Sequence, residues 1–166
     1  MRRLIAFGLS LGLLVLAGTA FAKEFKTGGL SGADEVPARD TNARGNALFE
    51  ISDDGLTISF KLIVANIDNV VAAHIHIGPA GVNGPVVLFL YGNVPAGGGS
   101  INGVISDGSA TAANLVGPLA GQPLSALIAA MEAGNAYVNV HTNDGVAPTN
   151  TGPGDFPGGE IRAQIR

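Results

Sequence analysis

Apolar residues along most of the chain recur at every second position, in short runs that are separated by Gly, Pro, Asn and Asp. Because successive side chains of a strand point to opposite faces, this alternation indicates β-strands with one buried face. Many short strands with turn residues between them are typical of an antiparallel sandwich or barrel. The pattern predicts strands at 24–30, 44–51, 56–65, 71–77, 86–91, 101–106, 136–141 and 159–165.

Two local signals refine this all-β prediction. The sequence Ser-Asp-Asp-Gly at 52–55 separates two alternating runs. Asp and Gly tolerate the dihedral angles of a tight turn, so a β-hairpin is expected there. The apolar residues of 124–133 instead follow helical spacing, and Gly134 offers a helix stop. We therefore expect an antiparallel Greek-key sandwich or barrel with one short helix.

The first residues, 1–22, are typical of a cleavable signal peptide: two arginines precede an apolar run, and a small-x-small motif ends at Ala22. The apolar run is shorter than the roughly 20 residues that span a membrane. Thr19 stands where a lipid anchor would need a cysteine. We expect cleavage after Ala22, a β domain at 23–166 with no membrane span, and a secreted or periplasmic location.

Charge and composition exclude several kinds of chemistry. The formal net charge is −4, and loss of the two leader arginines makes it more negative, so nucleic acid is not an expected partner. The chain has no cysteine, which excludes disulfides, thiolate nucleophiles and thiolate metal ligands. Any chemistry must come from histidines, carboxylates, amides and the backbone.

The three histidines of the chain occupy equivalent places in two predicted strands. In "AHIHI", His74 and His76 alternate with Ile75 and Ile77. In "AYVNVHT", Tyr137, Asn139 and His141 alternate with two valines. If the apolar residues face the core, all three histidines face outward. The α-carbons of the His-x-His pair then lie roughly 6 to 7 Å apart, from which two imidazoles can reach one ion.

Should the two strands lie together, His74, His76 and His141 could bind one metal ion, with water or an acidic loop residue completing the shell. Nitrogen ligands suit copper or zinc. Metal affinity should fall as the pH drops through about 6.5, the ordinary histidine pKa. The fold should tolerate replacement of these outward residues. The alternative is that they are solvated side chains that bind nothing.

Other charged residues are interpreted as structural. Glu160 and Arg162 stand two apart on one face of the last predicted strand, which predicts a surface ion pair worth little energy. Asp34 and Glu35 are expected in a turn.

Four motifs carry a resemblance to a known family. The stretches "LSGADEVPA", "AHIHIGPAGVNGPVV", "GNAYVNVHT" and "PGGEIRAQI", in this order, resemble the CHRD domain, a module of chordin and of many exported bacterial proteins. The resemblance covers 26–166. It implies an all-β extracellular module, either immunoglobulin-like or superoxide-dismutase-like in architecture.

The histidines also resemble the copper ligands of copper/zinc superoxide dismutases, which are Greek-key barrels with a His-x-His strand and one later strand histidine. The departures are the lack of a bridging histidine, of a cysteine pair and of a His-rich zinc loop. This resemblance implies copper-only chemistry, with Arg162 as the cation that could guide an anion.

These observations leave two main classes of function open. The first is an exported protein that binds copper or zinc through His74, His76 and His141. The second is a metal-free recognition or structural module that meets an extracellular or envelope protein. We favour a binding protein without catalytic residues over an enzyme, and dismutase activity is the third alternative.

Overall fold

Nine strands, three short 3-10 helices and one α-helix make up residues 23–166, the part of the chain that the computed structural model describes. The predicted signal peptide, 1–22, lies outside the described residues. The elements are β1 (Lys23–Lys26), β2 (Leu30–Ser31), η1 (Gly32–Asp34), β3 (Arg44–Ile51), β4 (Thr57–Asp68), β5 (Val70–Ile77), β6 (Val86–Tyr91), β7 (Ser100–Thr111), η2 (Ala112–Asn114), η3 (Gly117–Leu119), α1 (Leu124–Glu132), β8 (Ala136–Thr142) and β9 (Ile161–Gln164).

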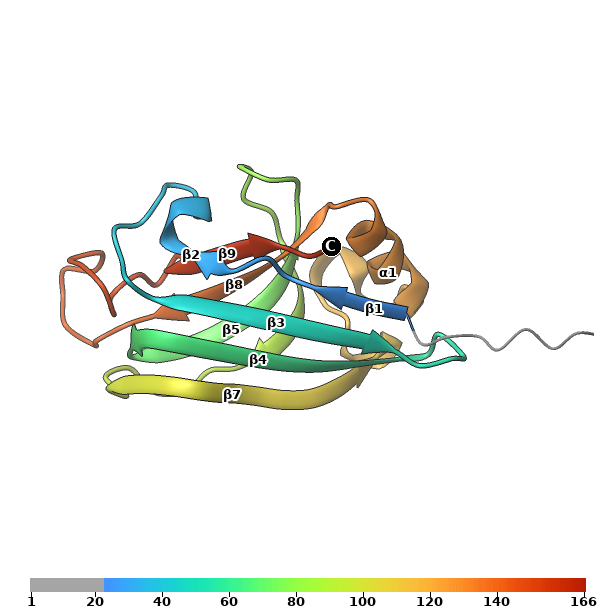
Figure 1. Ribbon diagram of the computed structural model, residues 1–166, viewed down its shortest axis with the longest axis horizontal. Helices are drawn as coiled ribbons and strands as arrows, with labels where there is room; N and C mark the ends of the chain where they lie inside the picture. Colours follow the sequence, from blue (N-terminus) through green and yellow to red (C-terminus); the bar gives the residue numbers. More distant parts are fainter. Residues whose placement is uncertain (1–22) are drawn as a thin grey trace, which may run out of the picture.

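The strands form one antiparallel sheet that curls into a nearly closed barrel (Figure 1). Their order is β6-β5-β8-β9-β2-β3-β4-β7, and β1 also pairs with β3. The two edges approach each other, since Ser106 Oγ on β7 donates a hydrogen bond to the carbonyl of Leu90 on β6 at 2.5 Å. Across this seam β5, β6 and β7 follow one another and β8 returns beside β5, which is the Greek-key order. The predicted all-β fold is confirmed.

The barrel interior is filled by the apolar side chains of the alternating runs. Every second residue of β3 is buried. Ile75 on β5 and Val138 and Val140 on β8 have no exposed surface. Burial of one such side chain stabilises a fold by about 1.5–3 kcal/mol, so these positions hold the strands in their register.

The predicted helix is confirmed as α1, which lies at one end of the barrel (Figure 1). Leu124, Leu127 and Met131 are its buried residues, and they cover that end of the core. Among residues 23–166, no helix combines the length and apolar character needed to cross a membrane.

Two predicted strands differ most from the observed ones. The strand predicted at 24–30 is divided into β1 and β2 by two glycines, although both pieces pair with β3. The strand predicted at 101–106 is twice as long in the structure, where β7 covers 12 residues. Its pairing with β4 continues through the turn-forming residues Asp107 and Gly108. Pairing with the long strand β4 thus outweighs the tendency of Asp107 and Gly108 to form a turn.

Candidate metal centre

The outward side chains of three adjacent strands form a polar face on the outside of the barrel. Ile75 and Val138 point into the core, so the alternate residues of β5 and β8 point away from it. Pairing of β5, β8 and β9 then sets these side chains side by side. The polar face comprises His74 and His76 on β5, Tyr137, Asn139 and His141 on β8, and Arg162 and Gln164 on β9.

Loops cover this polar face. The loop between β5 and β6 lies against Arg162, whose guanidinium donates hydrogen bonds to the carbonyls of Pro79 and Val82 at 3.0 Å each. The segment after η1 brings in Glu35, whose carboxylate accepts a hydrogen bond from Asn139 Nδ2 at 2.6 Å. Arg162 and Asn139 are consequently only 1% and 3% exposed, as deeply buried as core residues.

The histidines are correspondingly less exposed than outward-facing residues were expected to be. His74 and His76 are 9% and 8% exposed, and His141 is partly buried. The sequence pattern was right about their direction and wrong about their surroundings, because alternation says which way a side chain points and not what lies over it. Replacement of these residues should therefore disturb packing, contrary to the expectation from sequence.

Glu160 and Arg162 also differ from the prediction of a surface ion pair. Both are buried, and each bonds other partners. The Glu160 carboxylate accepts hydrogen bonds from the hydroxyls of Thr41 and Thr142, each at 2.6 Å, and from the Gly154 amide at 2.9 Å. It thereby links the segment before β3, the end of β8 and the loop before β9. Arg162, bonded to loop carbonyls, is not the exposed cation that could guide an anion.

The antiparallel pairing of β5 with β8 brings all three predicted ligands together. His74 Nδ1 lies 3.0 Å from His141 Nε2. The ring centres of His74 and His76 are 5.6 Å apart, and those of His76 and His141 are 6.1 Å apart. One nitrogen from each imidazole can be chosen so that all three lie within 4.8 Å of one another.

Backbone carbonyls determine which nitrogen of two imidazoles carries the proton. His76 Nδ1 lies 2.9 Å from the Gly84 carbonyl, and His141 Nδ1 lies 2.8 Å from the Pro157 carbonyl. A carbonyl oxygen only accepts, so each Nδ1 donates and each Nε2 keeps its lone pair. Metal-binding histidines are commonly oriented by this kind of bond. Gly84 has to be glycine, since a side chain there would overlap the backbone of Ile77.

Burial keeps the three imidazoles neutral. Burial, together with the neighbouring His141 and His76, lowers the pKa of His74 from 6.5 to about 4. Burial also lowers the pKa of His76 and of His141, although the carbonyl bonds to Gly84 and Pro157 oppose this change. At neutral pH each ring therefore offers a lone pair instead of a second proton.

The spacing of the nitrogens fits a small metal ion. Two ligands bound tetrahedrally at 2.0–2.1 Å lie about 3.3 Å apart. His141 Nε2 accepts a hydrogen bond from His74 Nδ1 at 3.0 Å, and a metal ion would replace this proton at a similar nitrogen–nitrogen separation. The widest separation of 4.8 Å requires a modest movement of one ring. His74 Nε2 and His76 Nε2 are buried without a hydrogen-bond partner. A metal ion would satisfy the unpartnered nitrogen of His76 directly.

A family comparison covers most of the described chain. The model of the CHRD domain matches residues 27–165. The chain belongs to the CHRD domain family. Neither the search of curated proteins nor the search of solved structures found a match.

Aromatic rings surround the histidines of this CHRD domain. The phenyl ring of Phe89 on β6 meets His74 edge-on, with ring centres 4.6 Å apart. Tyr137 stacks on His76 at 4.9 Å, and the guanidinium carbon of Arg162 lies 3.4 Å from the centre of the Tyr137 ring. The result is a column of guanidinium, phenol and imidazole along the polar face.

Sequence reasoning missed the role of Glu35, which was expected only in a turn. Its carboxylate is 5% exposed and bonds Asn139, and Gly159 packs directly on this pair. A Cβ at residue 159 would overlap both Asn139 Nδ2 and Glu35 Oε1, and its φ of +127° also favours glycine. The signal available in the sequence was the series of polar residues facing outward on three CHRD strands, next to long Gly-rich and Pro-rich loops.

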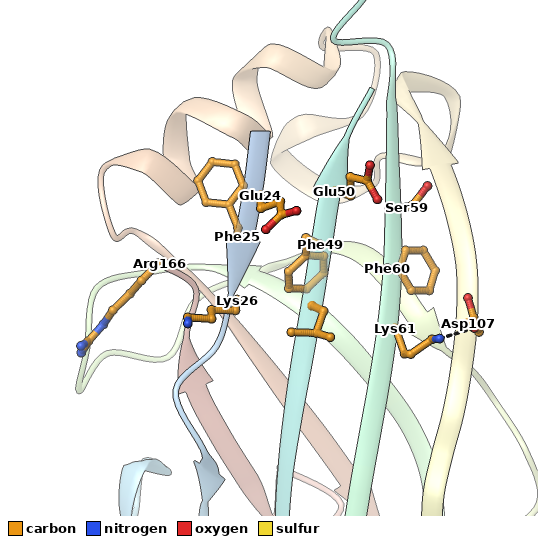
Figure 2. A pocket seen from close by; sticks show the side chains of 11 residues that line it. Glu24, Phe25, Lys26, Phe49, Glu50, Ser59, Phe60, Lys61, Asp107 and Arg166 are labelled. Carbon is orange, nitrogen blue, oxygen red and sulfur yellow. Dashed lines mark ion pairs between the residues drawn. The ribbon is translucent and has the colours of Figure 1, made fainter. Parts of the chain in front are cut away.

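A second feature of the CHRD domain lies away from the histidines. A hollow of about 520 Å³ runs along the outside of β1, β3, β4 and β7 (Figure 2). Its side chains are spread along the strands and do not converge on one point (Figure 2). The ion pair at its rim, Lys61 with Asp107 at 3.1 Å, is exposed and contributes little energy. The histidine cluster is therefore the better candidate for chemistry.

Proposed function

We propose that this CHRD-domain protein binds one copper or zinc ion through His74, His76 and His141. The observation that carries the proposal is the pair of carbonyl bonds that leave lone pairs on His76 Nε2 and His141 Nε2, within a cluster of three neutral imidazoles. Three nitrogens and no sulfur suit copper and zinc. Water would complete the coordination shell.

The proposed role is to hold the ion and not to catalyse a reaction on it. A catalytic metal needs an open position for its substrate. The two histidines of β5 are less than one-tenth exposed, and Phe89 and Tyr137 pack on them. This enclosure supports storage, transport or structural use of the metal.

We further propose that the protein is exported, to the periplasm or the exterior, and meets an extracellular or envelope protein there. The support is the signal-peptide pattern of the first 22 residues together with membership of the CHRD family. The amino terminus of exported protein tests the first part: it should be Lys23, and an uncleaved leader would contradict it.

Metal analysis of purified protein without a histidine tag tests the metal site. We expect close to one equivalent of copper or zinc per chain after exposure to either ion. Single His→Gln changes keep polarity and much of the volume, and each should weaken binding at least tenfold, or about 1.4 kcal/mol. The control variant Gln122→Ala alters an exposed polar residue in the turn before α1.

The same variants distinguish loss of the site from loss of the fold. Circular dichroism should show an unchanged β spectrum for any variant whose metal affinity is interpreted. If folded wild-type protein binds neither ion, or if the three His→Gln variants bind as tightly as Gln122→Ala, the metal proposal is wrong. The metal-free recognition module then replaces it.

A further inference from the structure

The charge around the histidine cluster bears on which ion it would hold, an inference that rests on the proposed metal site. Among residues 23–166 the candidate ligand group consists of three neutral imidazoles and includes no carboxylate. A cation belongs to the same column of rings: Arg162 lies over Tyr137, which stacks on His76.

One acidic group approaches the cluster through Asn139, which pairs with His74 across the strands. Glu35 accepts a hydrogen bond from Asn139 Nδ2, and it is flanked by the positive charges of Arg162 and Arg39. Burial raises the pKa of Glu35 to about 7, so at neutral pH much of this group carries no charge. Two further buried carboxylates, of Glu160 and Asp155, are bonded to the hydroxyls of Thr142 and Thr151 and do not belong to the candidate ligand group. The ligand group itself therefore offers no negative charge with which to compensate a bound cation.

Burial makes this lack of compensation important. The free energy needed to transfer an ion from water into a medium of low polarity grows with the square of its charge, so a divalent ion is penalised about four times as much as a monovalent one. Divalent ions in buried sites are normally compensated by anionic ligands. Here both histidines of β5 are nearly inaccessible and the ligands are neutral.

The number of available ligands also disfavours a divalent copper ion. Cu(II) prefers four or more ligands in a square or tetragonal arrangement. The cluster supplies three nitrogens, and the ring of Phe89 packs against His74 from the neighbouring strand without offering a ligand atom. A three-coordinate ion of low charge suits this enclosure better.

We propose that the three-histidine site holds copper as Cu(I), in preference to Cu(II) and Zn(II). Neutral ligands, burial and the nearby guanidinium each disfavour the divalent ions more than the monovalent one. Between the two divalent ions, imidazole ligands favour Cu(II) over Zn(II). The expected order of affinity is Cu(I), then Cu(II), then Zn(II).

Competition titrations with chelators measure the three affinities on the purified untagged protein, with Cu(I) handled anaerobically under a reductant. The matched pair Phe89→Glu and Phe89→Gln tests the physical reason. Phe89 is 45% exposed on an edge strand and pairs with His74 in the ladder, so both changes should be accommodated. Only Phe89→Glu adds a negative charge beside the cluster.

For wild-type protein we expect a Kd for Cu(I) at least tenfold below that for Cu(II). Phe89→Glu should reduce the ratio of the Cu(II) Kd to the Cu(I) Kd at least tenfold. Phe89→Gln should leave this ratio within threefold of the wild-type value. Tighter or equal binding of Cu(II) or Zn(II) by wild-type protein overturns the preference and leaves the metal site standing. A ratio that Phe89→Glu does not change overturns the charge argument. Failure to bind any of the three ions overturns the metal site itself.

Discussion

Replacement of Glu35 by glutamine should stabilise the protein, and the gain should grow with pH. The Glu35 carboxyl is buried beneath the segment that covers the polar face, where it bonds Asn139 Nδ2 at 2.6 Å and the Val36 amide at 3.3 Å. Burial raises its pKa from 4.5 to about 7, although the Val36 bond and the charges of Arg162 and Arg39 oppose the change. The glutamine side chain would keep an oxygen for Asn139 and would carry no charge at any pH.

The sign and size of the effect follow from the pKa in the two states. Below pH 4.5 the carboxyl is protonated in both the folded and the unfolded chain, and its titration does not affect stability. As the pH rises from 4.5 to about 7, the unfolded chain loses this proton first, so the folded state loses stability. For Glu35 this loss amounts to about 2.5 kcal/mol between pH 5 and pH 8. Glu35→Gln removes it.

Urea denaturation of metal-free protein at pH 5 and pH 8 measures the effect as a difference between wild type and variant. Relative to wild type, Glu35→Gln should increase the free energy of unfolding by about 2.5 kcal/mol more at pH 8 than at pH 5. Asp34→Asn is the matched control, since Asp34 is adjacent and exposed. A Glu35→Gln effect that is equal at the two pH values would refute the reasoning, as would a larger destabilisation at pH 8.

Two further predictions concern the cluster and its cover. The pH at which copper affinity falls should lie below 6.5, because burial lowers the pKa of all three histidines, that of His74 to about 4, and protons compete for the lone pairs only near those lowered values. A fall centred at pH 6.5, measured by chelator competition, would show that the histidines are solvated. Gly159→Ala should lower the free energy of unfolding by about 2 kcal/mol or more, since a Cβ overlaps Asn139 and Glu35 and φ is +127°. Gly28→Ala, where a Cβ meets nothing within 4 Å, is its control in the same denaturation experiment, and equal effects of the two changes would contradict the close packing.

The sequence by itself determined most of the strands, the α-helix among the described residues and the side of the sheet on which the core residues and the histidines lie. These features depend on a period of two or of 3.6 residues, which neighbouring positions impose on each other through the local backbone geometry. Thus Ile75 and Val138 were assigned to the core correctly, and His74, His76 and His141 were placed outside it correctly. The shared face of the three histidines needed one further fact, that β5 pairs with β8, and the sequence pattern does not contain this pairing.

Only the tertiary structure decided what covers the polar face. The carbonyls that orient His76 and His141 come from loop residues 8 and 16 positions away, and Glu35 reaches Asn139 from 104 positions away. Loop paths of this kind follow from long-range packing and leave no periodic signal. Burial, and with it the lowered histidine pKa values and the raised pKa of Glu35, depends on those paths. Alternation of residues sets the direction of a side chain, whereas solvation is set by whatever part of the chain folds over it.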